Sequence, residues 1–134
     1  MKLIFCLDDR GGMMFNKRRQ SQDRVLRARI LSRLGNNRLI VSPYSAKQFT
    51  EDGSIVVSKK PQKSALECDF YFVEDLPYSF DDVSEIVIYR WNRHYPSDVT
   101  FDGDLRSLGF VLQSSEDFEG SSHEKITEEI YIKA

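Results

Sequence analysis

The first forty residues constrain the fold most, because they alternate an apolar strand, a polar loop, an amphipathic helix and a second apolar strand. The first apolar run covers Lys2 to Leu7, the loop covers Asp8 to Gln20, and the next apolar run lies at Arg38 to Val41. A helix between two buried strands favours a right-handed crossover that leaves the strands parallel. The sequence therefore predicts an α/β fold.

The helix is expected over Gln22 to Leu34. Its apolar residues recur every four positions between Leu26 and Leu34, which places them on one face. Ser21 is expected to cap the N-terminus, and the negative charge of Asp23 is favoured in the first turn.

Short apolar runs farther along the chain have the length and composition of strands buried in a parallel sheet. They cover Arg38 to Ser42, Ser54 to Ser58, Asp69 to Val73 and Glu85 to Tyr89. A short helix is expected over Tyr44 to Thr50, and a further helical turn within Pro77 to Val83.

The last third of the chain has strand patterns that no long helix separates. They cover Val99 to Phe101, Gly109 to Gln113 and Ile126 to Ile132, and the last favours an antiparallel hairpin. The segment Ser114 to Lys125 is too polar for a core strand. We therefore expect one domain over residues 1–134, with few helices, a mostly parallel central sheet and a C-terminal antiparallel hairpin.

The composition excludes several classes of protein. With 134 residues, 40% of them hydrophobic, the chain can bury a core without metal or disulfide staples. Cys6 and Cys68 match no zinc motif, and no metal is expected. No apolar run approaches the ~20 residues of a membrane helix, and the first residues lack the features of a signal peptide. We expect a cytoplasmic protein without a membrane partner.

Positive charge is concentrated at the predicted helix, although the whole chain carries a net charge of −2. Between Lys17 and Arg38 there is one acid, Asp23, and there are eight basic residues: Lys17, Arg18, Arg19, Arg24, Arg27, Arg29, Arg33 and Arg38. This asymmetry predicts an anionic partner, a phosphate, near the loop that leads into the helix.

Two basic segments are candidate ligand sites. Arg18, Arg19, Ser21 and Arg24 surround the helix start, where guanidinium groups and backbone N–H groups can bind an anion. The alternative is a solvated charged loop.

The second basic segment is Arg90-Trp91-Asn92-Arg93-His94-Tyr95, which follows a predicted buried strand. Trp91 could stack on a base while Arg90, Asn92 and Arg93 hold a phosphate. The alternative is a tryptophan packed in the core, with the arginines paired to surface acids.

A third segment, Gly120 to Lys125, brings His123 next to hydroxyl and acidic residues. Histidine can act as an acid or a base near neutral pH, and Lys125 could stabilise negative charge. A polar hairpin loop without chemistry is the alternative. The glycine-bearing segment Gly11 to Phe15 is either a mobile lid or a hydrophobic segment packed into the core.

The order of the predicted elements resembles dihydrofolate reductase, a three-layer α/β fold. The segment LDDRGGMMFNKRRQSQD resembles the loop of that family that gates its substrate, and Asp23 falls close to the carboxylate that binds the pterin. RLIVSPYSAKQFT, which contains Tyr44 and Ser45, resembles the strand and helix that begin the cofactor site. SIVVSKK resembles the strand whose edge binds phosphate.

The resemblance implies NADPH as a possible cofactor, but the chain departs from the family at one motif. The family has a pair of glycines after its fifth strand, where backbone N–H groups bind the pyrophosphate. Here EIVIY is followed by Arg90 to Pro96, without glycine. We therefore regard the scaffold as degenerate and expect no cofactor.

The segments NKRRQSQD, YSAKQF, YRWNRHYPSD and GSSHEKIT also resemble an uncharacterised family of small cytosolic proteins of Gram-positive bacteria. Some of its members are labelled ribonuclease Z. That enzyme needs a His-x-His-x-Asp-His cluster for two zinc ions, whereas this chain has only His94 and His123.

The sequence leads to one principal hypothesis and leaves open whether the chain is an enzyme. The hypothesis is a protein that binds a phosphate-bearing ligand, a nucleotide or RNA, in an arginine-lined pocket. One alternative is an NADPH-dependent reductase, in which Asp23 orients the substrate and Ser45 and Lys59 lie near the phosphates. Another is a metal-independent ribonuclease that uses His123 or His94 as acid or base. An acidic surface that binds a basic protein is a further possibility.

Overall fold

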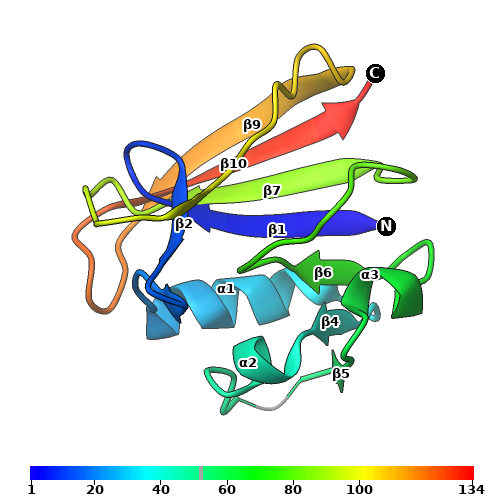
Figure 1. The fold of residues 1–134 in the computed structure, drawn as a ribbon, viewed down its shortest axis with the longest axis horizontal. Coiled ribbons are helices and arrows are strands. Elements are labelled where there is room, and N and C mark those ends of the chain that lie inside the picture. The colour runs from blue at the N-terminus through cyan, green and yellow to red at the C-terminus, as the bar shows by residue number, and fades with distance from the viewer. Residues whose placement is uncertain (52) are drawn as a thin grey trace.

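The structure, a computed structural model, describes residues 1–51 and 53–134. Its central sheet has seven strands in the order β5-β4-β6-β1-β7-β10-β9 (Figure 1). They are β1 (Lys2–Leu7), β4 (Leu39–Val41), β5 (Ile55–Val57), β6 (Phe70–Phe72), β7 (Glu85–Arg90), β9 (Phe110–Phe118) and β10 (Ile126–Lys133). A smaller sheet consists of β3 (Arg18–Arg19), β2 (Gly12–Phe15) and β8 (Val99–Thr100). The helices are α1 (Arg24–Leu34), α2 (Pro43–Ala46) and α3 (Pro61–Ser64).

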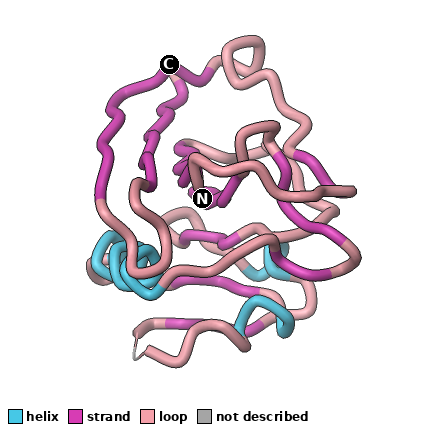
Figure 2. The backbone as a smooth tube through the Cα atoms, turned by 90° about the vertical axis from the view of Figure 1, so that its left-hand side faces the viewer, coloured by secondary structure: helices cyan, strands magenta, loops and turns pink. Residues whose placement is uncertain are grey.

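The central sheet is mostly parallel, as the short apolar runs predicted. Strands β5, β4, β6, β1 and β7 run parallel to one another. Strand β10 is antiparallel to both β7 and β9, which confirms the C-terminal hairpin. Figure 2 shows the two strands of this hairpin side by side at the outer edge of the molecule.

Alternating residues of the strands build two cores, one on each face of the sheet. On one face Leu26, Ile30 and Leu34 of α1 pack with Val87 and Tyr89. The predicted apolar stripe of the helix therefore faces the sheet.

The other face is covered by loops and the small sheet. Met13 and Met14 of β2 are 4% and 2% exposed and pack there with Phe5 and Ile88. Of the two interpretations of Gly11 to Phe15, the structure supports a segment packed into the core, because Met13 and Met14 belong to this second core, whereas Phe15 is exposed.

Three segments differ from the sequence expectations. Residues 77–83 form no helix, because Tyr78 and Phe80 turn toward Phe101 instead of lining one helical face. Helix α2 ends at Ala46 and is continued only by single turns. Strand β9 continues to Phe118 despite its polarity, because an edge strand that pairs only with β10 leaves its side chains in water.

In the described part of the chain, no helix has the length and apolar character needed to cross a membrane.

Glu128 connects α1 to β10. Its side chain is 3% exposed and accepts hydrogen bonds from Arg29 Nε at 2.9 Å, Arg33 Nη2 at 2.6 Å and the Tyr89 hydroxyl at 2.9 Å. Burial alone would raise the pKa of Glu128, but these donors outweigh burial and lower it. A buried carboxylate with three donors is stable only while all of them are present.

We expect Glu128→Gln to lower the free energy of unfolding by about 2 kcal/mol, because two half-buried guanidinium groups would lose their shared counterion. Urea denaturation at pH 7 measures the change. Glu119→Gln, at an exposed position of the loop between β9 and β10, is the matched control. Equal unfolding midpoints for the two variants would show that the ion pairs of Glu128 do not stabilise the fold.

Candidate functional site

Asp23 forms the N-cap of α1 and is completely enclosed by hydrogen-bond donors. Its Oδ1 accepts from the backbone N–H groups of Leu26 at 3.1 Å and Ser121 at 3.0 Å. Its Oδ2 accepts from the backbone N–H of Ser122 at 2.8 Å and from His123 Nδ1 at 3.1 Å. The sequence suggested Ser21 as the N-cap, but the cap is Asp23.

These donors keep Asp23 ionised although its side chain has no exposed surface. Burial alone would raise the pKa of Asp23. The N–H groups of Ser122 and Ser121, together with His123, outweigh burial and hold the pKa well below its usual value. A buried carboxylate of this kind is a fixed negative charge at the start of a helix.

His123 lies on the other side of this carboxylate and is 4% exposed. Its ring stacks on Trp91, with the centroids 4.4 Å apart and the planes at 24°. Its Nε2 is 3.1 Å from the Ser21 hydroxyl and 3.1 Å from the Tyr95 hydroxyl. Because an ionised carboxylate can only accept, Nδ1 donates to Asp23 and Nε2 of the neutral ring is left as an acceptor.

The loop between β9 and β10 brings His123 to the N-terminal end of α1 (Figure 1). Gly120 in this loop lies directly against the Asp23 carboxylate, where a Cβ atom would clash with it. Ser121 Oγ accepts from the Arg24 backbone N–H at 3.0 Å. The sequence analysis considered Asp23 and His123 separately. Their contact could not be predicted from local patterns, because the two residues are 100 positions apart.

The predicted arginine pocket is not formed by Arg19 and Arg90, because each is paired with an acid. Arg19 lies 2.9 and 3.1 Å from the two carboxylate oxygens of Glu74 and stacks on the Tyr44 ring at 4.4 Å. Arg90 Nε lies 2.7 Å from Glu129. These charges hold strands and loops together, and their pairing opposes the attraction of a further anion.

The second basic segment is split between the two faces of the sheet. Trp91 packs in the core under α1, whereas Arg90 follows the alternation of Ile88 to the opposite face. Asn92 Nδ2 donates to the Lys125 carbonyl at 3.2 Å and to Thr127 Oγ1 at 2.9 Å. The expected platform and clamp of Arg90 and Trp91 is therefore wrong.

The other predicted ligand-binding residues lie in different places. Arg24, Arg93 and Lys125 are exposed, and Ser45 is buried against the Ser42 hydroxyl at 3.1 Å. Arg18 lines a small cavity of about 310 Å³, whose walls also include Gln20 and Tyr95.

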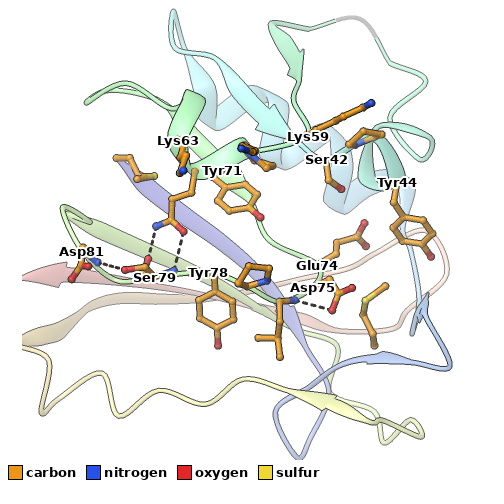
Figure 3. Close-up of a pocket in the computed structure, with 18 of the residues that line it drawn as sticks. Ser42, Tyr44, Lys59, Lys63, Tyr71, Glu74, Asp75, Tyr78, Ser79 and Asp81 are labelled. Atoms are coloured by element: carbon orange, nitrogen blue, oxygen red, sulfur yellow. Dashed lines mark hydrogen bonds between the residues drawn. The ribbon is translucent and has the colours of Figure 1, made fainter.

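A larger cavity of about 1020 Å³ lies at the carboxyl ends of β4, β5 and β6. Four lysines line it, and they are Lys17, Lys59, Lys60 and Lys63. Figure 3 shows Tyr71 between Lys59 and Lys63 on one side and Tyr78 on the other. Glu74, Asp75, Asp81 and Asp82 also line this cavity.

Of the residues that line this cavity, Lys59 and Tyr44 were predicted to lie near a ligand, whereas Tyr71 and Tyr78 were missed. The run Ser-Lys-Lys after a predicted strand was the one local signal. Tyr71 was assigned to the core because an apolar run gives no indication of which strand end borders a cavity.

No metal centre is evident among residues 1–51 and 53–134, in which no three His, Cys, Asp or Glu side chains gather as metal ligands. Burial raises the pKa of Cys6, so its thiol lacks the thiolate character of a reactive cysteine.

Comparisons with known proteins identify the fold. No protein-family model matches this sequence, and no curated protein matches it. Among solved structures, the chain is similar to dihydrofolate reductase from Enterococcus faecalis complexed with NADP(H) and RAB-propyl. The TM-score is 0.64 and the identity 9%, over 98% of this chain and 95% of the other. The chain therefore has a dihydrofolate reductase-like fold.

Asp23→Asn is expected to destabilise the protein by about 2 kcal/mol at pH 7, since it removes an ionised acceptor from the four donors above and from the Ser122 hydroxyl, which lies 3.1 Å from Oδ2. The pKa of Asp23 is lower in the folded than in the unfolded chain. Its contribution is therefore complete above the unfolded value of about 3.9 and is lost as the pH falls below it.

Urea denaturation of the wild type and Asp23→Asn at pH 7, 4 and 3 measures this dependence. The difference between them should shrink toward acid, while Asp9→Asn, at an exposed position, should match the wild type throughout. A difference that stays constant between pH 7 and pH 3 would mean that the charge of Asp23 contributes nothing.

Proposed function

We propose that this chain binds a nucleotide in the cavity of about 1020 Å³ at the carboxyl ends of β4, β5 and β6. In sheets of parallel strands, ligands bind beyond the carboxyl ends of the strands. The observation that carries the proposal is the set of four lysines along this cavity, which is large enough for a nucleotide.

The four lysines are available to a ligand, unlike Arg19 and Arg90, which are paired with acids. Lys17, Lys59, Lys60 and Lys63 are exposed, and none of them forms an ion pair within the described ranges 1–51 and 53–134. An ammonium group is a compact donor that binds phosphate oxygens as a point charge. The positive charge that can bind a phosphate is thus supplied by lysine, in place of the arginines that the sequence suggested.

The rest of the cavity wall suits a base and a sugar. Tyr71, Tyr78, Met14 and Leu76 supply ring faces and apolar surface on which a base can pack. The carboxylates of Glu74 and Asp75 can accept hydrogen bonds from ribose hydroxyls or from amino groups of a base. A single cavity with these groups favours a small nucleotide over RNA, which would need an extended positive groove.

The structural neighbour supports the same ligand class, because the dihydrofolate reductase with the similar fold is complexed with NADP(H). The reductase alternative for this chain has less support. Asp23, which would orient a substrate, does not line the large cavity, and its carboxylate oxygens are occupied by donors of this chain.

Calorimetric titration with NADPH, ATP and ADP-ribose at low salt tests this proposal. At least one should bind, and Lys59→Ala/Lys60→Ala should weaken that binding by about tenfold, the equivalent of about 1.4 kcal/mol. Added salt should weaken the wild-type complex, because exposed ammonium groups are screened.

The control variant is Lys125→Ala/Lys133→Ala, which removes the same charge away from the cavity. It should bind like the wild type. If no nucleotide binds at millimolar concentration, the proposal is wrong. If both double variants weaken binding equally, the ligand does not occupy this cavity.

A further inference from the structure

We infer that Ser21, His123 and Asp23 form a nucleophilic relay that can accept an acyl group from a small carboxylic ester. This site is independent of the proposed nucleotide cavity, because none of these three residues lines it. The inference rests on a chain of contacts in which a hydroxyl, an imidazole and a carboxylate follow one another. A hydroxyl next to a base that is oriented by a third group is the arrangement that activates serine nucleophiles.

The two nitrogens of the imidazole ring contact different partners. Ser21 Oγ lies 3.1 Å from His123 Nε2, and His123 Nδ1 lies 3.1 Å from Asp23 Oδ2. Trp91 holds the ring plane by stacking at 4.4 Å. The ring is therefore fixed between two partners, with its acceptor nitrogen directed at hydroxyl groups.

The proton positions follow from Asp23. This carboxylate accepts from the backbone of Ser121 and Ser122, which leaves it ionised and unable to donate. His123 Nδ1 must donate to it, and Nε2 of a neutral ring is then an acceptor that faces both the Ser21 and the Tyr95 hydroxyl, each at 3.1 Å.

A small cavity of about 310 Å³ lies next to this relay, although neither Ser21 nor His123 is among the residues that line it. Ser21 is half-buried and directly follows Gln20, which lines this cavity. Tyr95 lines it as well, and the Tyr95 hydroxyl is 3.1 Å from His123 Nε2. Arg18, on the same wall, has no ion pair in the described part of the chain and favours an ester that carries a negative group.

The reaction balances with water as the second substrate. Ser21 Oγ forms a bond to the carbonyl carbon as its proton moves to His123 Nε2. The bond from that carbon to the ester oxygen breaks, and the leaving alcohol takes the proton from Nε2. Water then loses a proton to Nε2 and attacks the acyl-serine, which releases the acid and returns the proton to Ser21.

Diisopropyl fluorophosphate tests the relay, because it phosphorylates activated serines. Trypsin releases residues 20–24 as the peptide QSQDR, in which Ser21 is the only hydroxyl residue, and Tyr95 falls in a different peptide. Mass spectrometry of the treated full chain should find the adduct on QSQDR. Ser21→Ala should abolish it with an unchanged melting temperature, and Ser107→Ala, at an exposed serine, should leave it unchanged.

Two further variants separate a relay from a structural role. His123→Ala should slow labelling at least a hundredfold, and added imidazole should restore part of the rate. Asp23→Asn should lower the maximal labelling rate without changing the reagent concentration that gives half of it. Absence of an adduct on QSQDR, or labelling of His123→Ala at the wild-type rate, would overturn the inference.

Discussion

The buried, ionised carboxylate of Asp23 is the interaction on which the rest of this structure depends. It caps α1 through Leu26 and at the same time binds the loop between β9 and β10 through the backbone of Ser121 and Ser122. A charge taken out of water needs a full set of donors, and this set comes from segments about 100 residues apart. The fold must therefore close before the charge is satisfied, which couples the helix start to the C-terminal hairpin. The position of His123, against Trp91 and Ser21, is a consequence of this closure.

Many arginines and the cavity lysines have different roles in this structure. Arginines of α1 and its surroundings are paired with acids far along the chain, as Arg29 and Arg33 are with Glu128. Their planar guanidinium groups suit two-pronged ion pairs that join elements. The lysines beside the large cavity remain unpaired within residues 1–51 and 53–134. Much of the local positive charge in the sequence thus contributes to stability at α1, while the ammonium groups at the large cavity are available to a ligand.

Local sequence patterns predicted helix α1 and the parallel strands, because these elements are specified by the spacing of nearby apolar residues. The fourfold spacing from Leu26 to Leu34 located α1 within two residues, and short apolar runs located the parallel strands. The polar half of β9 was missed because strand pairing at an edge needs no apolar side chains. In the site, Asp23 and His123 were each identified by residue type, but their contact and the role of Gly120 depend on tertiary packing. The arginine pocket was overestimated for the same reason, because a count of charges along the chain does not include distant partners such as Glu74.

The central claim is that Asp23 remains ionised and fixes His123 with its proton on Nδ1. Nitrogen-15 NMR of the imidazole rings tests this claim directly, since the chain has only two histidines and a His123→Gln variant assigns the signals. At pH 7 the account predicts the Nδ1–H tautomer for His123, with a slowly exchanging ring proton, while the exposed His94 shows the average of a ring in water. A His123 signal in the Nε2–H tautomer, or one indistinguishable from that of His94, would contradict the account.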